Sequence, residues 1–237
     1  VRIERLAPGA VRITAEGLIT AVDPALLLVR NSITVLGDGS VLVNPQYIPG
    51  FNAVDLPTVP RIGMQMELTA GFDDIRWYGR GPTETYSDRK EARVDVYGGA
   101  VAEQFVSTYS EPGETGNKVE VRWVALEDRD RGVGLLAIGQ PQLSVNALHF
   151  RTADLEGPEH VYELTPRPEV TLNLDLVQMG VGGDNSWGAR PHNEFQPRLV
   201  QPTGYAFVLK PYRVGQADPM AMSKISMADL VQPPSAN

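Results

Sequence analysis

The chain of 237 residues has no cysteine, which excludes disulfide bonds, cysteine-based zinc sites and thiol catalysis. It also lacks any apolar run of the roughly 18–20 residues that a membrane-spanning helix needs, and no signal-peptide pattern is visible. Basic residues are outnumbered, so the formal net charge is −8 and the pI is about 4.9. This balance argues against a binder of nucleic acid or of an anionic membrane, and it suits a neutral ligand such as a sugar.

Helical periodicity is scarce as well, whereas 23 glycines and 19 prolines indicate many turns. Leu26–Leu36 and Ser40–Tyr47 flank Gly37-Asp38-Gly39, a pattern that predicts a β-hairpin. Only residues 159–164 are expected to form a short helix. Further strands are expected at 11–15, 61–68, 75–78, 93–97, 101–106, 119–126, 134–138, 143–148, 171–176 and 204–209.

Two of these strands alternate clearly. In the first, Val119, Val121, Trp123 and Ala125 are expected to share one face. In the second, the three leucines of Thr171–Leu176 point one way and its polar residues the other. Strands recurring every 10–15 residues between turn residues predict an all-β fold, a large antiparallel sandwich over residues 1–213. Residues 214–237 lose the alternation and are expected to form an irregular C-terminal tail.

Residues 180–187, Gly-Val-Gly-Gly-Asp-Asn-Ser-Trp, carry three glycines in four positions and predict a turn after the strand at 171–176. A tryptophan on such a turn is badly placed for a core. We therefore expect Trp187 to be a platform for a flat ligand face such as that of a sugar ring, with Asp184 and Asn185 beside it. Plain packing of Trp187 is an equally open alternative.

A second polar stretch, Trp77–Arg89, follows a strand and contains Gly79, Gly81 and Pro82 at a turn. If it is extended, Glu84, Tyr86 and Asp88 share one face, with Arg80 or Arg89 as ion-pair partners. A sugar-facing or domain-facing cluster is one interpretation. A turn held by ion pairs is the better interpretation for each residue taken singly.

Other candidates for chemistry are weaker. The polar loop 107–118 holds Glu111 and Glu114, which are more simply explained as solvated side chains than as an acid/base pair. The spacing of His149, His160 and His192 does not suit a shared metal, so no metal site is expected. Of the three, His192 lies nearest Trp187 in sequence and is the better site candidate.

Five stretches, in this order along the chain, carry a resemblance: Pro60–Gly63, Trp77–Arg89, Glu114–Asn117, Val121–Trp123 and Met179–Trp187. Together they resemble the C-terminal small-chain domain (domain 5) of bacterial β-galactosidases, glycoside hydrolase family 2, from about residue 10 to Tyr212. The resemblance implies a supersandwich like that of galactose mutarotases. It also implies that a further stretch normally precedes residue 10, so the chain is expected to be a piece of a longer protein.

The resemblance further implies that the two catalytic glutamates lie on a separate (β/α)₈ barrel, so no catalytic residue and no cofactor are expected on this chain. Mg and Na ions would belong to other domains. Trp187 would stack on the sugar in the barrel's active site, with Asp184 and Asn185 shaping its loop and with His192 and Glu84 as weaker contacts. The parent would hydrolyse terminal β-D-galactosides such as lactose with retention. We expect the parent to be a homo-oligomer, and the sequence leaves open whether its compartment is the bacterial cytoplasm or the periplasm.

Two alternatives stay open. One is a stand-alone sugar isomerase like aldose 1-epimerase, with His160 or His192 and Glu194 or Glu84 as acid and base. The other is a non-catalytic carbohydrate-binding module or the small subunit of a two-chain enzyme. The expected partners are accordingly a β-galactoside and a barrel domain, not nucleic acid or a membrane.

Overall fold

The computed structural model describes residues 1–20, 27–50, 58–185 and 187–225. Its strands are β1 Arg2–Ala7, β2 Ala10–Ile19, β3 Leu27–Leu36, β4 Val41–Pro49, β5 Arg61–Leu68, β6 Asp74–Gly81, β7 Arg93–Ala100, β8 Lys118–Asp128, β9 Val133–Leu148, β10 Val170–Gln178, β11 Thr203–Gly204 and β12 Ala206–Arg213. The helices are α1 Thr152–Leu155 and α2 Pro219–Met222, with 3₁₀ turns at Val101–Gln104, Val161–Glu163 and Asn193–Phe195. None of these helical segments is long and apolar enough to cross a bilayer.

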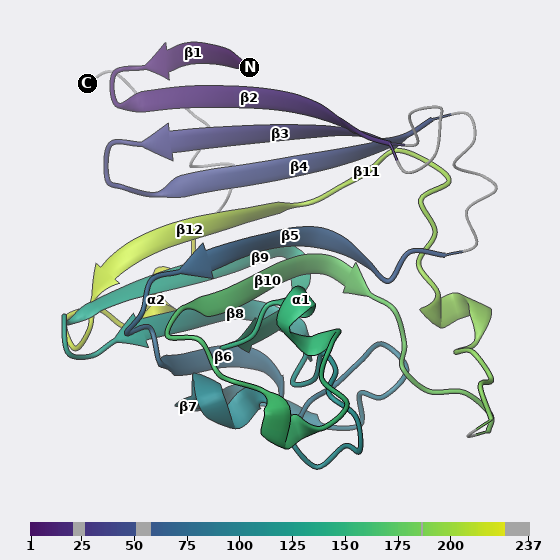
Figure 1. Ribbon diagram of the computed structural model, residues 1–237. Coiled ribbons are helices and arrows are strands. Elements are labelled where there is room, and N and C mark those ends of the chain that lie inside the picture. Colours follow the sequence, from purple (N-terminus) through teal and green to yellow (C-terminus); the bar gives the residue numbers. More distant parts are fainter. Residues whose placement is uncertain (21–26, 51–57, 186, 226–237) are drawn as a thin grey trace.

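All strand pairs are antiparallel, in the order β1-β2-β3-β4-β12-β9-β8-β6-β7, while β10 joins β9 to β5 (Figure 1). The predicted all-β, antiparallel fold class is confirmed. Strand β9 connects the layers, because Val133–Gln140 pairs with β12 and Ser144–Leu148 pairs with β10. The sequence had predicted two strands here, at 134–138 and 143–148, but they are one.

The main core lies between the β5–β10 pair and the strands β4, β12, β9, β8 and β6. Leu172 and Leu174 of β10 are fully buried there against Phe207 of β12 and Val145 of β9. The expected inward leucine face of β10 is confirmed. The opposite face of this strand is also buried, since Thr171, Asn173 and Asp175 are all below 4% exposed.

The prediction that Val119, Val121, Trp123 and Ala125 share one face of β8 is wrong. Val121 belongs to the main core, whereas Trp123 and Ala125 pack in a second cluster on the other side of the sheet. The reason is an irregularity in the β8–β9 register on either side of Val121, with Glu120 at a φ of +54°. A bulge adds one residue to a strand and reverses which side chains share a face.

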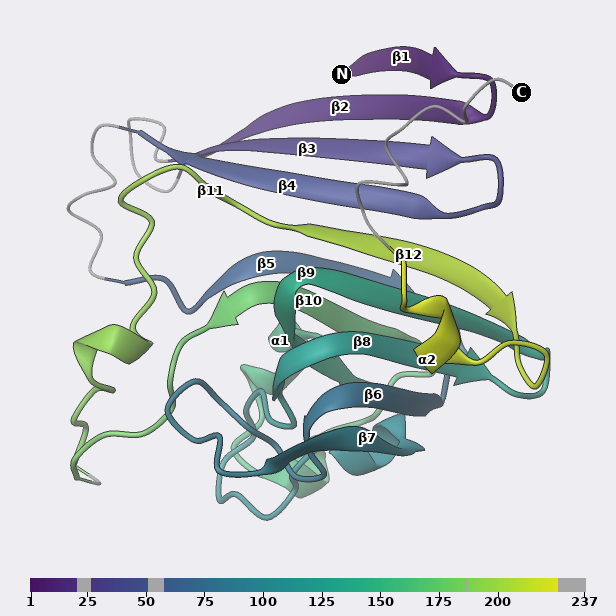
Figure 2. The ribbon, with the colours of Figure 1, turned by 180° about the vertical axis from the view of Figure 1, so that it is seen from behind.

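The second cluster is covered by the C-terminal segment. Val214, Ala217, Met220, Met222 and Ile225 pack against it, and α2 lies over β8 and β9 (Figure 2). Asp218 accepts hydrogen bonds from the backbone N–H groups at 220 and 221 and begins the helix. Of the tail expected at 214–237, residues 226–237 lie outside the described residues.

The remaining predictions of secondary structure have mixed outcomes. The hairpin around Gly39 (φ +85°) is confirmed as β3 and β4, and the expected helix at 159–164 is a short 3₁₀ turn. The strand expected at 101–106 is wrong. Val101 and Gln104 are buried three residues apart in a 3₁₀ turn, which Glu103 closes by accepting from the Ala100 N–H.

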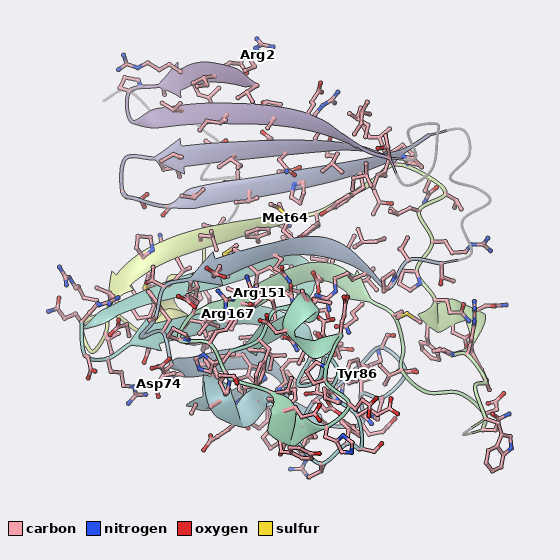
Figure 3. The ribbon with its side chains drawn as sticks, viewed as in Figure 1. Arg2, Met64, Asp74, Tyr86, Arg151 and Arg167 are labelled. Carbon is pink, nitrogen blue, oxygen red and sulfur yellow. The ribbon has the colours of Figure 1, made fainter. Side chains whose placement is uncertain are left out.

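Strands β1–β3 form a wing beyond β4, at the end of the molecule marked by Arg2 in Figure 3. Tyr86 lies at the opposite end, in the loops that follow β6. Apolar side chains of the wing stay partly open to solvent, Ile3, Val11 and Val35 among them. The candidate site residues of the sequence analysis lie in two places. One is the loop-rich end that holds Tyr86, and the other is the chain that follows β10.

Candidate functional site

The chain that leaves β10 forms a loop closed at its base. The Met179 N–H donates to the Pro60 carbonyl at 2.9 Å, and the Gly180 N–H donates to the Phe195 carbonyl at 2.8 Å. Between Gly180 and Phe195, hereafter the Trp187 loop, the chain extends away from the sheets (Figure 1). The loop therefore has a fixed base and an exposed tip.

Trp187 stands on this loop with 88% of its surface exposed. The Asn185 side-chain oxygen accepts from the Trp187 N–H at 2.9 Å and from the Ala189 N–H at 3.3 Å, a local turn that shapes the backbone around the indole. The other two tryptophans, Trp77 and Trp123, are only 2% and 1% exposed. Trp187 is therefore not packed against the residues that the structure describes, which was the alternative to a ligand platform. Its role as a substrate contact stays a prediction.

Asp184 and His192 meet across the same loop. His192 Nε2 lies 2.9 Å from an Asp184 carboxylate oxygen, and both side chains are largely exposed. The hydrogen bond to Asp184 and the charges of Asp184 and Glu194 raise the pKa of His192 above its usual value. Asp184, Asn185 and His192 therefore interact within the Trp187 loop, and their role as substrate contacts stays a prediction.

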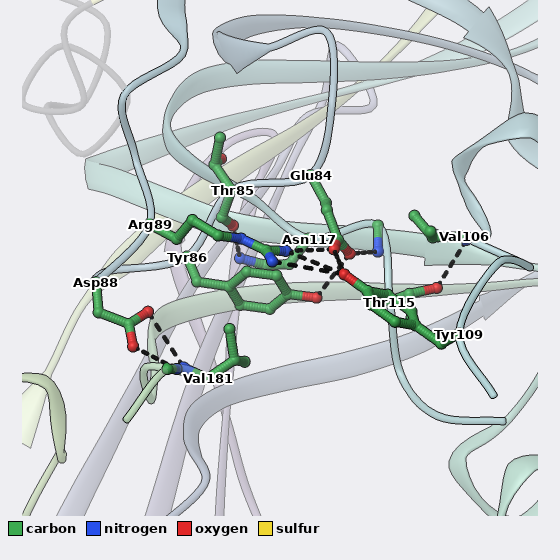
Figure 4. A network of polar contacts seen from close by, with 12 residues as sticks. Glu84, Thr85, Tyr86, Asp88, Arg89, Val106, Tyr109, Thr115, Asn117 and Val181 are labelled. Carbon is green, nitrogen blue, oxygen red and sulfur yellow. Dashed lines mark hydrogen bonds and ion pairs between the residues drawn. The ribbon is translucent and has the colours of Figure 1, made fainter. Parts of the chain in front are cut away.

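Glu84 lies at the centre of a polar cluster in the loops after β6 (Figure 4). Its carboxylate accepts from the Tyr109 hydroxyl at 2.5 Å, from the Gly116 N–H at 2.8 Å and from the Tyr86 hydroxyl at 3.0 Å. Arg89 completes the shell with an ion pair. With 7% of its side chain exposed, Glu84 holds three chain segments together.

Burial would raise the pKa of Glu84, but the hydrogen bonds from Tyr109, Gly116 and Tyr86 and the charge of Arg89 outweigh it and lower the pKa. The carboxylate is therefore ionised and its oxygens are occupied by donors. Its geometry is that of a structural anchor. The sequence had named Glu84 as a weaker sugar contact, and that role stays untested.

Behind this cluster, Lys118 of β8 is 3% exposed. Its ammonium donates to the Gly116 carbonyl at 2.7 Å and lies 5.0 Å from the Trp77 ring centroid. Burial lowers its pKa to about 8, against a smaller opposing effect of Glu84. Lys118, Glu84, Arg89 and Tyr109 line part of a hollow of about 590 Å³. Lys118 and Tyr109 both lie in the polar loop 107–118 that the sequence marked, but their contact with Glu84 depends on the fold and could not be predicted from spacing.

The expected convergence of Glu84, Tyr86 and Asp88 is wrong. Tyr86 and Arg89 exchange backbone hydrogen bonds of 3.0 Å, so the stretch turns instead of extending. Tyr86 still reaches Glu84, but the Asp88 carboxylate faces the other way and accepts from the Val181 and Gly182 N–H groups (Figure 4). Arg89 is the ion-pair partner of Glu84, whereas Arg80 pairs with Glu120.

A buried carboxylate that the sequence analysis did not single out lies on β10. Asp175 is opposite Gly63 of β5, and a side chain at Gly63 would overlap the Asp175 carboxylate. Neither carboxylate oxygen has a hydrogen-bond partner, and the nearest cation is the Arg61 Nε at 3.7 Å. Burial raises the pKa of Asp175 to about 7, despite the Arg61 charge.

In the parts of the chain that the structure describes, no group of three or more His, Asp or Glu side chains has the arrangement of a metal site. Glu111 and Glu114 do not form a pair of free carboxylates, because Glu114 is bound to Arg61 at 2.6 Å. His149 lies near Asp73, and His160 lies near Glu163. Neither histidine is close to the Trp187 loop in the sequence. The candidate site is therefore the Trp187 loop and its contacts.

The family model described as β-galactosidase small chain matches residues 9–209. This chain belongs to that family. It is 38% identical over 192 residues to a β-galactosidase of Priestia megaterium, which covers 81% of this chain and 18% of that protein. It is 35% identical over 175 residues to the β-galactosidase BgaC of Bifidobacterium adolescentis, covering 73% and 16%.

The chain thus spans less than a fifth of the length of these β-galactosidases. Among solved structures, a GalM/aldose epimerase homologue from C. elegans superposes with a TM-score of 0.46 at 10% identity, covering 90% of this chain and 69% of that one. The small-chain match includes both the Glu84 cluster and the Trp187 loop.

Proposed function

We propose that this chain is the C-terminal domain of a retaining β-galactosidase that hydrolyses terminal β-D-galactosides such as lactose. The catalytic glutamate pair lies on a separate barrel domain, and this chain supplies Trp187 as a sugar platform on a rigid scaffold. The observation that carries the proposal is the exposure of Trp187, 88%, on a loop whose base is tied to Pro60 and Phe195.

The physical argument starts from the indole ring. A large apolar ring fully in water is unfavourable unless something covers it, and stacking on a flat partner face recovers that area. Asn185 fixes the backbone at Trp187, so less ordering remains to be done when a ligand binds. A net negative charge does not repel a neutral sugar, and the Asp184–His192 pair on the same loop offers polar groups to sugar hydroxyls.

The platform role is tested in the whole enzyme that contains this domain. Trp187→Ala is expected to cost ~1–3 kcal/mol of binding, judged from ring stacking on aromatics, and to lower kcat/KM accordingly. Trp187→Phe, which keeps an aromatic ring, should lose less binding than Trp187→Ala. Tyr162→Ala is the matched control, because Tyr162 is an exposed aromatic (81%) on another segment. Equal steady-state kinetics for Trp187→Ala and the parent would exclude the platform.

The division of labour is tested on the isolated 237-residue chain. Four buried carboxylates of the described residues, Asp175, Asp128, Glu127 and Glu84, have side chains that are 1%, 3%, 6% and 7% exposed and offer a substrate little access. We expect no release of galactose from a chromogenic β-galactoside by the pure chain, and activity when the barrel-containing part is supplied. Turnover that a substitution of one of the chain's own carboxylates abolishes would refute the proposal.

A further inference from the structure

The two polar stretches singled out in the sequence meet at one side chain. The Asp88 carboxylate accepts from the Val181 N–H at 3.1 Å and from the Gly182 N–H at 2.7 Å, one oxygen to each donor (Figure 4). These two donors begin the Trp187 loop, just after its closure by Gly180 and Phe195. Asp88 is thus a link from the turn after β6 to the loop after β10, 93 positions later in the chain.

Two glycines of the loop, Gly180 and Gly182, are explained by this carboxylate. A side chain at Gly180 would overlap the Asp88 carboxylate, and one at Gly182 would lie 3.2 Å from its nearer oxygen. Neither glycine has a positive φ. Their requirement is therefore for close approach of the carboxylate to the backbone, not for a left-handed turn.

Asp88 is itself held firmly. Tyr86 and Arg89 on either side of it exchange two backbone hydrogen bonds, and Tyr86 is 2% exposed. Arg89 and Tyr86 both bind Glu84, which is anchored to the Gly116 backbone. The Asp88 acceptor is therefore presented to the loop from the buried Glu84 cluster. Charge-assisted hydrogen bonds from backbone N–H groups are about twice as strong as neutral ones.

We propose that Asp88 is a positioning residue for Trp187. By fixing Val181 and Gly182, it sets the direction in which the Trp187 loop leaves the domain, and Asn185 then sets the local turn at the indole. The inference rests on the proposed platform role of Trp187. A misplacement of about 1 Å at a substrate contact can cost up to ~100-fold in rate, so a loop anchor away from the sugar affects catalysis.

The first test reads the loop without any activity, on the 237-residue chain. Because Trp77 and Trp123 are buried, acrylamide quenches mainly Trp187, and the anisotropy of the quenchable component reports on that residue. Asp88→Ala should lower the anisotropy of the quenchable component. Asp88→Asn, which keeps one acceptor oxygen, should lower it less. Asp130→Asn removes the same charge from the exposed β8–β9 turn and should leave the anisotropy unchanged. Thermal melts of each variant establish that it is folded.

The second test is a double-mutant cycle in the whole enzyme. We expect Asp88→Ala to lower kcat/KM roughly tenfold, with Asp88→Asn intermediate and the double variant Asp88→Ala/Trp187→Ala no worse than Trp187→Ala alone. Additive losses would mean that Asp88 acts independently of Trp187 and would overturn the inference, as would an unchanged anisotropy in the first test. If Trp187→Ala alone has no effect while Asp88→Ala lowers the anisotropy, the platform role fails and the anchoring of the loop stands.

Discussion

Glu84 and Asp175 are two buried carboxylates in different parts of the same fold, and their surroundings are opposite. Glu84 receives four donors from the loop cluster: two hydroxyls, a backbone N–H and the Arg89 guanidinium. Asp175, between strands β5 and β10, receives no hydrogen bond, and Arg61 is 3.7 Å away. The pKa of Glu84 is accordingly lowered, while that of Asp175 is raised to about 7.

The difference teaches that burial by itself does not decide what a carboxylate does. Where donors replace water, the charge is kept and links distant segments. Where strand packing provides no donors, desolvation favours the neutral acid. Glu84 therefore stabilises the loop end from which Asp88 reaches the Trp187 loop, and we expect Asp175 to make the stability of the fold depend on pH.

The largest expected effect is at Glu84. Glu84→Ala leaves the Gly116 N–H, the Tyr86 hydroxyl and the Arg89 charge without their acceptor, so the free energy of unfolding should fall by about 3–5 kcal/mol. Urea denaturation at pH 7 measures this loss. Glu84→Gln, which keeps the shape and one acceptor oxygen, should lose clearly less. Equal small losses in both variants, below about 1 kcal/mol, would show that the cluster is not an anchor.

The effect at Asp175 comes next and depends on pH. In the unfolded chain the pKa of an aspartate is near 3.9, whereas the folded value is about 7. Between these values the folded state binds more protons, so stability falls as pH rises from about 4 to 7. The full penalty, present above pH 7, is of order 4 kcal/mol from about three pKa units.

Asp175→Asn removes this ionisation. Urea denaturation at pH 4 and pH 8 should show the variant gaining on the parent chain at pH 8 and little difference at pH 4. Gln65→Glu is not a suitable comparison, because Gln65 donates to Asn173 at 2.9 Å. Asp130→Asn, on the exposed turn, is the matched control and should follow the parent at both values. A pH-independent difference between Asp175→Asn and the parent would contradict the raised pKa.

The smallest effect is expected at Arg89, an exposed member of the Glu84 cluster. Its side chain is 51% exposed, so solvent screens the ion pair and Arg89→Ala should cost no more than about 1 kcal/mol. The same denaturation series gives the value. A loss equal to that of Glu84→Ala would mean that the ion pair, not the set of hydroxyl and backbone donors, stabilises the cluster.

Much of the fold was predictable because alternation and turn residues are local signals. Leu172 and Leu174 point into the core as their spacing predicts, and the hairpin at Gly39 follows from its turn residues. The failures have a common cause in long-range contacts. The bulge at Glu120 moved Trp123 to the opposite face from Val121, and no pattern within the strand marks that extra residue.

The sequence by itself determined the strand-rich, turn-rich character of the chain and the outward turn that bears Trp187, because glycine, asparagine and alternating apolar residues act on their neighbours. Only the tertiary structure decided which carboxylates are paired. Glu84 meets Tyr109 and Gly116, and Asp88 meets Gly182, through contacts 25 to 94 positions apart. Such pairings depend on how strands stack and loops pack, so no local rule on residue spacing contains them.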